Sequence, residues 1–244
     1  MHRLLVETEL LAQDAPTLPP DAARHLKVLR PKCGEEIELF DGHGKWRVYA
    51  WADGLRATSQ AVQTLPTPRT SLTLFACVTK GSRWDWIIEK ATELGVTRIV
   101  PVISDRTIVR SPKPERAAKR ERWMRIAEDA ARQSDAKWLP EIAEAVDFAD
   151  SLALVKETTC FVGALTNPPP QPILRAITGE LKAGGGRSLS VFVGPEGDFT
   201  PEELAALLDI AIPTSFGSTI LRAETAAIFA VGVLAAAVAE ARRE

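Results

Sequence analysis

Two segments near the C-terminal end of the chain carry residue types that could bind a ligand and act on it. The first, VFVGPEGDFTPEELA, is a short apolar run that enters the turn at residues 194–197 and then a helix start signal. In α/β proteins, ligands bind beyond the carboxyl ends of strands, where glycine lets them approach the backbone. A glycine-rich turn without a ligand explains the same spacing equally well. Neither GxGxxG nor GxxxxGK[ST] occurs, so dinucleotide and P-loop nucleotide binding lose their main support.

The second segment, FGSTILRAETA, leads into an apolar helix through Arg222 and Glu224. Charged residues at the edge of a buried helix are costly unless they are paired or functional. These two could simply balance each other or cap the helix, and from the residues alone this structural interpretation is favoured.

The first part of the chain is expected to form a small β domain. Residues 35–65 alternate like β strands and break at residues 41–44 and 53–54, where hairpin turns require glycine. This predicts a small antiparallel sheet or barrel, preceded by a short helix that Pro31 ends. Pro66 and Pro68 stiffen a linker, which places the domain boundary at about residue 69.

The second part has the pattern of an α/β domain. Four short, nearly continuous apolar runs occupy residues 72–78, 98–103, 160–165 and 189–194. Helical segments separate them, which predicts a parallel sheet with helices on its faces. Ser82 with Asp85, and Thr200 with Glu203, are expected to form capping boxes. The last helix, residues 223–239, is apolar nearly all round and is expected in the core or in a subunit interface.

The charge of the chain is uninformative in total but uneven in distribution. The 244 residues are 45% hydrophobic and 25% charged, with a net charge of -2, as in an ordinary folded protein of one or two domains. Residues 104–125 hold eight basic and three acidic residues, and a second basic cluster lies at residues 24–32. A solvated helix face is the commoner explanation of a charge run, but two clusters in two domains favour nucleic acid.

The cysteines and histidines suggest neither a disulfide framework nor a metal site. Each type occurs three times, without ligand spacing. The first 30 residues lack the apolar core of a signal peptide. The longest apolar run, residues 226–239, is shorter than the roughly 20 residues that cross a bilayer. We therefore expect a soluble, cytoplasmic protein.

Five ordered motifs that cover almost the whole chain resemble the RsmE family of bacterial 16S ribosomal RNA (uracil-N3)-methyltransferases, in the SPOUT superfamily. They are HLKVLRPKCGEEIELFDG, KGSRWDWIIEKATELGVTRIVPVISDRT, RWMRIAEDAARQSDAKWLPEI, FVGPEGDF and FGSTILRAETA. The resemblance implies a PUA-like, RNA-binding β-barrel domain over residues 1–69. It also implies a SPOUT methyltransferase domain over residues 70–244, with an α/β fold and a C-terminal trefoil knot.

The resemblance also implies the cofactor and the partners. S-adenosylmethionine should be the methyl donor, 16S ribosomal RNA of the small ribosomal subunit the partner, and the protein a homodimer without metal. The dimer is expected to form through the final helix, where four apolar residues recur at helical spacing: Ile228, Val231, Leu234 and Val238.

Carried over onto this sequence, the resemblance implies the site residues. Three loops should bind the methyl donor, with the residues Gly163, Ala164, Leu165, Gly194, Pro195, Glu196, Gly197, Phe216, Gly217, Ile220, Leu221 and Thr225. The basic residues expected to bind RNA are Arg24, Lys27, Arg30, Arg106, Arg116, Lys119 and Arg120.

The chain departs from the family pattern in two places. Asp198 stands where the family usually has glycine. Ser134-Asp135-Ala136 replaces a segment in which the family commonly has an arginine, so a cation expected to contact RNA is missing beside Gln133. Lys137 is the basic residue that remains nearby in the sequence.

The expected reaction is methylation of N3 of one uridine. This nitrogen carries a proton that must leave, and a cation beside the developing negative charge lowers the barrier. We predict that Arg222 is this cation and that Glu224 orients it or acts as a general base. Two alternatives stay open: a SPOUT ribose 2'-O-methyltransferase, which nucleoside analysis would reveal, and a non-catalytic ribosomal-RNA-binding assembly factor, which would need no cofactor.

Overall fold

The chain divides into two units in the computed structural model. The described residues are 1–58, 60–109, 112–155, 158–184 and 188–241. Unit 1 comprises Met1–Pro68 with Glu128–Leu139, and unit 2 comprises Arg69–Ala127 with Pro140–Glu244. The predicted linker ends where the first piece of unit 1 ends. The second piece of unit 1, which contains the last turns of a long helix, was not predicted from the sequence.

Unit 1 is built on a small sheet. Its elements are β1 (His2–Leu5), η1 (Thr8–Ala12), α1 (Pro20–Leu29), β2 (Glu36–Phe40), β3 (Lys45–Trp51), β4 (Leu55–Ala57) and β5 (Gln63–Thr64). The predicted helix and both predicted hairpins are confirmed; Gly44 has φ 91° and Gly54 has φ 145°, values that favour glycine. The strand order is β1-β2-β3-β4, with β5 on β3.

The predicted closed barrel is not found among the described residues of unit 1. Its outer strands β1 and β4 pair with β2 and β3 and not with each other, so the sheet is open. The last two strands, β4 and β5, have three and two residues, which give too few ladder hydrogen bonds to close the sheet.

A buried ion cluster fixes the end of the long helix within unit 1. Arg3 Nε lies 2.8 Å from Glu38 Oε1, and Lys137 Nζ lies 2.5 Å from the same oxygen. Arg3 also donates to the carbonyl oxygen of Ala131 at 2.5 Å. Asp135, which contacts both cations, has φ 61°, a conformation that favours glycine. Only 10% of the Lys137 side chain is exposed, so Lys137 does not replace the missing arginine at the surface.

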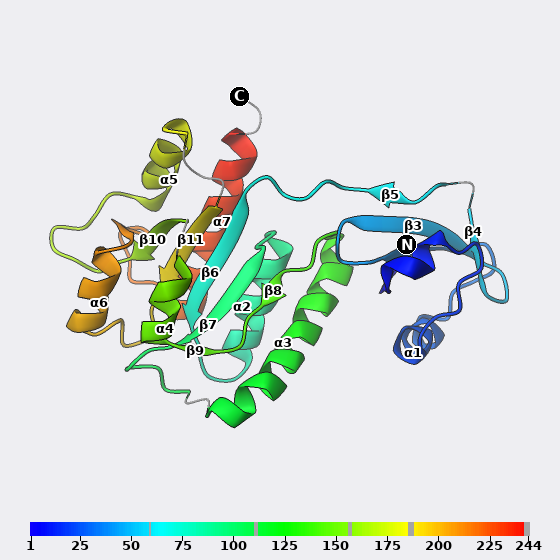
Figure 1. Cartoon of the computed structure of the whole chain (residues 1–244), viewed down its shortest axis with the longest axis horizontal. Helices are drawn as coiled ribbons and strands as arrows, with labels where there is room; N and C mark the ends of the chain where they lie inside the picture. Colours follow the sequence, from blue (N-terminus) through cyan, green and yellow to red (C-terminus); the bar gives the residue numbers. More distant parts are fainter. Residues whose placement is uncertain (59, 110–111, 156–157, 185–187, 242–244) are drawn as a thin grey trace. The chain divides into compact units, whose positions relative to one another are not determined.

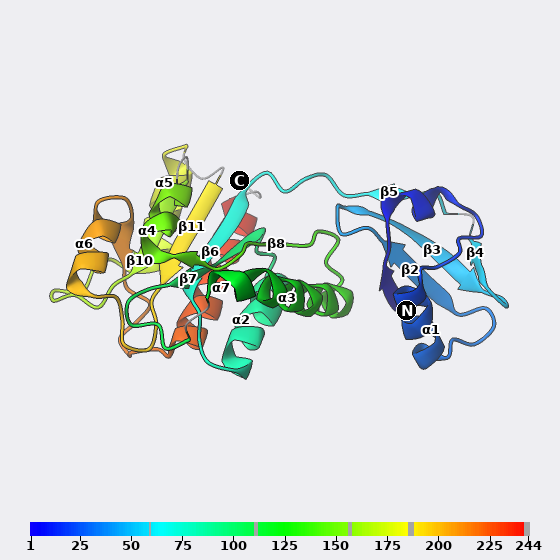
Figure 2. The ribbon, with the colours of Figure 1, turned by 60° about the horizontal axis from the view of Figure 1, so that its bottom comes forward.

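Unit 2 contains a parallel sheet covered by helices on both faces (Figures 1 and 2). Its strands are β6 (Ser71–Cys77), β7 (Arg98–Ile103), β8 (Glu141–Ile142), β9 (Val146–Asp147), β10 (Thr159–Gly163), β11 (Ser188–Val193) and β12 (Ile212–Thr214). Its helices are α2 (Ser82–Glu93), α3 (Lys113–Ser134), which ends in unit 1, α4 (Phe148–Leu152), η2 (Ala153–Val155), α5 (Ile173–Lys182), α6 (Pro201–Leu208) and α7 (Ala223–Ala241). The order is β12-β10-β11-β6-β7-β8, with β9 also on β7, and the predicted α/β fold with a parallel sheet is confirmed.

Alternation along the strands separates two apolar layers. In β6, Leu72 and Leu74 face the layer formed with α2, α5 and α7, whereas Phe75 faces the layer formed with α4 and α6. Phe75 stacks on Phe192 of β11 with ring centroids 4.4 Å apart. Because both faces are covered, the strands read as continuous apolar runs, and the carboxyl ends of the strands are left as the place where a ligand can bind.

The two predicted capping boxes have different outcomes. At α6, Thr200 Oγ1 accepts from the amide of Glu203 at 3.2 Å, and Glu203 Oε2 accepts from the amide of Thr200 at 3.0 Å, as predicted. At α2 the prediction is wrong: the cap is Gly81, with φ 66°, and no side chain caps the helix. The Asp85 carboxylate pairs instead with Arg122 of α3.

The last helix, α7, is a core helix. Val231 and Leu234 are each 1% exposed and Val238 is 6% exposed, packed with α2, α5 and the sheet. Buried side chains cannot form a subunit interface, so the predicted dimer face is wrong at these three positions. By length and composition α7 is the one helix of the described chain that could cross a membrane, but half of its apolar window is buried inside the protein.

Candidate functional site

A cavity of about 310 Å³ opens at the carboxyl ends of three neighbouring strands, β10, β11 and β12. The three loops predicted to bind the methyl donor follow these strands. The predicted residues that line the cavity are Gly163, Ala164, Leu165, Gly194, Pro195, Glu196, Phe216, Gly217, Ile220 and Leu221. Gly197 and Thr225, also predicted, lie outside its lining. The topology therefore brings together three loops, of which the first and the last are more than 50 residues apart in the sequence.

Two glycines let the loops approach one another at the cavity wall. A Cβ atom on Gly163 would lie 2.7 Å from the ring of Phe216. A Cβ atom on Gly194 would lie 3.2 Å from Asp198 Oδ1 and from the ring of Phe199. Side chains at these positions would displace their neighbours, so backbone atoms form this part of the wall.

The loop after β11 is held by its own hydrogen bonds and by an arginine. Asp198 has φ 60° and accepts through Oδ1 from the amide of Phe199 at 2.8 Å. This left-handed conformation favours glycine, and a short polar side chain that bonds locally also tolerates it. Arg106 donates to the carbonyl oxygen of Gly197 at 2.8 Å. Arg106, predicted to bind RNA, thus supports the cavity loop.

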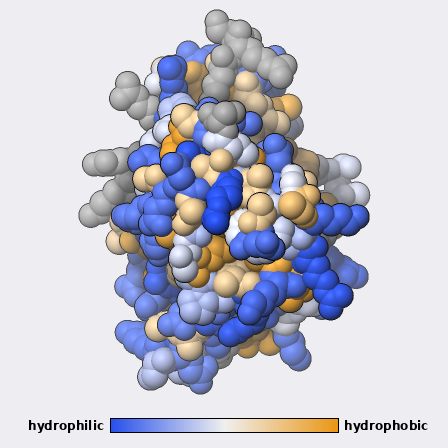
Figure 3. Space-filling model, turned by 90° about the vertical axis from the view of Figure 1, so that its right-hand side faces the viewer, coloured by the Kyte–Doolittle hydropathy of each residue, from blue (hydrophilic) through white to orange (hydrophobic). Residues whose placement is uncertain are grey.

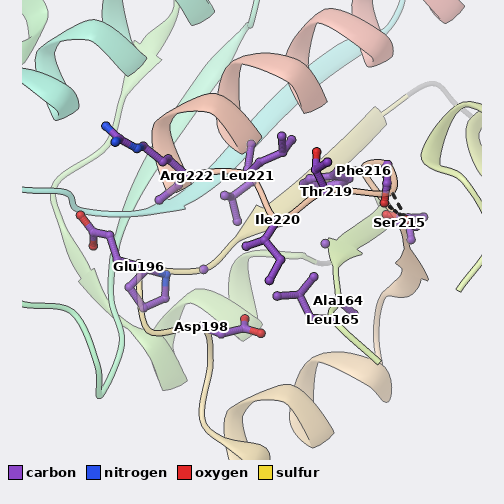
Figure 4. Close-up of a pocket in the computed structure, with 18 residues that line it drawn as sticks. Ala164, Leu165, Glu196, Asp198, Ser215, Phe216, Thr219, Ile220, Leu221 and Arg222 are labelled. Carbon is purple, nitrogen blue, oxygen red and sulfur yellow. Dashed lines mark hydrogen bonds between the residues drawn. The ribbon is translucent and has the colours of Figure 1, made fainter. Parts of the chain in front are cut away.

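Exposed apolar side chains cover the cavity. Ile220 is 81% exposed and Leu165 is 65% exposed, and in Figure 4 these two side chains point toward each other across the cavity. The Phe216 ring lies 5.9 Å from that of Phe229 on α7. Apolar groups at such exposed positions beside backbone polar groups suit a flat, partly apolar ligand.

Sequence reasoning missed two polar residues of the cavity, at the end of β12 and directly after it. Thr214 and Ser215 both contribute to the lining, beside Thr219 of the predicted loop. Ser215 Oγ donates to the carbonyl oxygen of Gly217 at 3.1 Å (dashed in Figure 4). Because β12 has only three residues, its apolar run was too short to be predicted as a strand. The polar residues at its end were therefore not expected near the cavity.

Arg222 and Glu224 are not paired with each other. Arg222 lines the cavity and is exposed, and its side chain makes no hydrogen bond or ion pair with any residue in the described part of the chain. The Glu224 side chain is 8% exposed, and its Oε1 lies 4.0 Å from Nε of Arg83. The predicted orienting contact between Glu224 and Arg222 is therefore absent, because Glu224 faces a different arginine.

The buried thiols offer no nucleophile. Burial raises the pKa of Cys77 to about 12 and that of Cys160 to about 11, so both stay protonated at neutral pH. No cluster of three potential metal ligands occurs in the ranges that the structure describes.

Residues 66–235 match the family described as RNA methyltransferase domain. Over 234 residues the chain is 32% identical to ribosomal RNA small subunit methyltransferase E of Synechocystis, a match that covers 92% of this chain and 74% of the relative. The chain belongs to this RNA methyltransferase family.

Two solved structures with bound cofactor have the same fold as this methyltransferase. The ribosomal RNA small subunit methyltransferase E of Neisseria gonorrhoeae, bound to S-adenosylmethionine, is 29% identical, with a TM-score of 0.79 and 95% coverage of each chain. A putative methyltransferase of Legionella pneumophila, in complex with the same cofactor, is 27% identical, with a TM-score of 0.76, and the match covers 97% of this chain and 96% of that one.

The basic stretch of the methyltransferase is largely occupied by internal contacts. Arg116 Nη2 lies 2.6 Å from Asp147 Oδ1, and 11% of the Arg116 side chain is exposed. Arg120 donates to a backbone carbonyl of β8 at 2.6 Å, and Lys119 pairs with a glutamate one turn earlier at 3.3 Å. Arg110 lies outside the described residues. The guanidinium groups of Arg116 and Arg120 therefore hold α3 against β8 and β9, and their predicted contact with RNA stays a prediction.

The basic residues of unit 1 are more accessible. Lys27 and Arg30 line a cavity of about 390 Å³ beside Trp51 and form no ion pair within the described residues. Arg24 is 3.7 Å from Asp21, and both side chains are largely exposed. Figure 3 shows a face of the molecule on which hydrophilic residues are interspersed with apolar ones. Cations beside an apolar wall are the chemistry of a nucleic-acid surface.

Proposed function

We propose that this protein transfers a methyl group from S-adenosylmethionine to N3 of a specific uridine in the 16S ribosomal RNA of the small ribosomal subunit. The observation that carries the proposal is the cavity at the ends of β10, β11 and β12, in a chain that belongs to the RNA methyltransferase family. Titration calorimetry with the cofactor, followed by nucleoside analysis of methylated subunits, tests it.

The residues at the cavity fit this cofactor. The wall at Gly163 and Gly194 is backbone, which a Cβ atom would fill, so amide and carbonyl groups can meet the polar edge of an adenine. Leu165 and Ile220 provide apolar surface for the adenine ring. When bound, the cofactor supplies an electrophilic methyl group on a positively charged sulfur.

Two residues of this chain would act on the acceptor. The guanidinium of Arg222, exposed and unpaired among the described residues, stabilises the negative charge that develops on the uracil as N3 loses its proton. Glu224 serves as proton acceptor, since its Oε2 is buried and has no hydrogen-bond partner. The uridine must be unpaired or flipped out, because N3 faces the pairing edge.

The two units would have different roles in the reaction. We infer that unit 2 is a SPOUT domain with a C-terminal trefoil knot, an inference supported by the entry of β11 between β10 and β6. Unit 1 serves as the PUA-like RNA-binding domain, supported by its small mixed sheet and its accessible cations. Because its proposed substrate is ribosomal RNA, we propose that the protein is cytoplasmic.

RNA binding should depend steeply on salt, and this dependence should arise partly from unit 1. Replacing Lys27 and Arg30 by glutamine is expected to flatten the plot of log affinity against log salt, by about 0.7 to 0.9 for each lost phosphate contact. Fluorescence anisotropy with a fragment of the ribosomal RNA measures the slope. As a control, Arg175 and Lys182 on α5, both exposed, are replaced in the same way and should leave the slope unchanged. An unchanged slope in the Lys27/Arg30 variant would remove unit 1 from the phosphate contacts.

The protein should be a homodimer that uses the exposed side of α7. Phe229 is 40% exposed next to the cavity, on the face of α7 that the core leaves open. Replacing Phe229 by aspartate should shift the sedimentation mass at low micromolar concentration from dimer to monomer. Replacing Leu174 on α5, 53% exposed, by aspartate should not. A wild-type mass near 26.6 kDa would contradict the dimer.

A further inference from the structure

Arg83, in the first turn of α2, lies between two carboxylates at the charged end of the cavity. Its Nη1 is 3.0 Å from Glu196 Oε1, and its Nε is 4.0 Å from Glu224 Oε1. Glu196 lines the cavity, as does Arg222, and in Figure 4 both side chains extend to the same side, away from Ala164. Arg83 is not part of the cavity lining, but its partner Glu196 is, so its guanidinium stands directly behind the lining.

Several N–H donors of the Arg83 guanidinium have no partner among the described residues. Its side chain is 49% exposed, and one hydrogen bond, to Glu196, is found within the described residues. A guanidinium offers five N–H donors in a planar fork. Since two carboxylates balance its charge, Arg83 is held in place, while the remaining N–H groups can still donate to a ligand.

Glu224 provides a second, independent indication of a ligand. Its side chain is 8% exposed, and Oε2 is hidden from solvent without any hydrogen-bond partner among the described residues. Buried acceptors of this kind are rare, because an unpaired buried oxygen is destabilising. The oxygen therefore lacks an N–H donor. Glu224, like Arg83, lies outside the residues that line the cavity, so a nucleobase edge that supplies the donor must enter beside the Arg83 side chain.

These groups match the imide edge of uracil, which presents a carbonyl acceptor, the N3–H donor and a second carbonyl acceptor in a row. We propose that Arg83 and Arg222 bind the two carbonyl oxygens of the target uracil while its N3–H donates to Oε2 of Glu224. The proposal rests on the function proposed above. Cytosine would be disfavoured at both positions. Its N3 is an acceptor and would face the carboxylate, which is also an acceptor, and its amino group is a donor and would face an arginine, which is also a donor.

The same residues account for the proton that leaves N3 and for the bonds that form and break in the reaction. The N3 proton moves to the Glu224 carboxylate, N3 forms a bond to the methyl carbon, and the bond from that carbon to the sulfonium sulfur breaks to leave a neutral thioether. The two guanidinium groups stabilise the negative charge shared by the carbonyl oxygens as the proton leaves. Glu224 returns its proton to solvent when the methylated base departs.

Single-turnover methylation of the small subunit by Arg83→Ala, measured across pH, tests this role. We expect the rate constant to fall about 10²-fold, as for loss of one preorganised donor, with the cofactor affinity unchanged. Without the Arg83 cation the imide loses its proton less readily, so the pH at half-maximal rate should rise. Arg83→Lys should restore part of the rate and part of this shift, because it keeps the charge and loses the fork.

Arg98 provides a matched control, because it pairs with Glu141 at 3.3 Å at the opposite end of the strands. Arg98→Ala should leave the rate and the pH profile as in the wild type.

An Arg83→Ala variant with wild-type rate and pH profile would overturn the inference while leaving the proposed function intact. Loss of cofactor affinity together with rate would also overturn it, since Arg83 would then act only by holding Glu196. If Arg83→Ala does not fold, Arg83→Gln, which keeps the side-chain length, takes its place. A wild-type enzyme that forms no 3-methyluridine would overturn the proposed function itself.

Discussion

Arg222→Ala is expected to methylate the small ribosomal subunit about 10²- to 10³-fold more slowly than the wild type in single turnover. The guanidinium lines the cavity and makes no ion pair with the described residues, so its donors are available for charge that develops on the uracil. Because that charge appears in the transition state, cofactor affinity should change little. Arg222→Lys should recover only part of the loss, since a point charge does not reproduce a planar fork.

Thermal melts and cofactor titration distinguish this role from a structural one. The absence of an Arg222–Glu224 ion pair leads us to expect a melting temperature close to that of the wild type. A variant that melts early and binds the cofactor poorly would show that Arg222 holds the entry to α7. A variant that melts normally and methylates at near the wild-type rate would remove Arg222 from the mechanism.

Gly194→Val should abolish the heat of S-adenosylmethionine binding in a calorimetric titration. A Cβ at this position already lies 3.2 Å from Asp198 Oδ1 and from the Phe199 ring, and valine adds two methyl groups at the cavity wall. The side chain would displace the loop after β11 and occupy the space that a ligand needs beside the backbone.

Gly179→Val on α5 is the matched control for this prediction. No atom lies within 4 Å of a Cβ built on Gly179, so the same substitution should leave binding unchanged. Normal cofactor binding by a folded Gly194→Val protein would place the cofactor site elsewhere on the chain. Circular dichroism on both variants checks that they fold.

The sequence predicts the fold of unit 2 well because that fold follows from local patterns. Apolar runs buried on both faces become parallel strands, and Thr200 with Glu203 forms the predicted capping box. The Ser82 prediction fails because Gly81 takes the cap position and Asp85 pairs with a residue of another helix. Whether the sheet of unit 1 closes into a barrel also depends on pairing between distant strands, which alternation along a single strand cannot specify.

For a similar reason, the candidate site can be predicted only in part from the sequence. Glycines at strand ends mark the loops, but the partner of each charged residue depends on the tertiary fold. Glu224 was expected to face Arg222, two positions away, and instead faces Arg83, far away in the sequence. Arg116 and Arg120 belong to a basic run, yet their guanidinium groups bond to a segment that follows α3. Charge counting along a helix does not indicate which charges reach solvent.

The central claim is tested most directly by mass analysis of nucleosides from small-subunit RNA of cells with and without the gene, repeated after treating the deficient subunits with purified protein and S-adenosylmethionine. We expect 3-methyluridine to be absent without the gene and to be restored at one uridine by the protein. A ribose-methylated nucleoside in its place, or no change in any methylated nucleoside, would contradict methylation of uridine N3 by this protein.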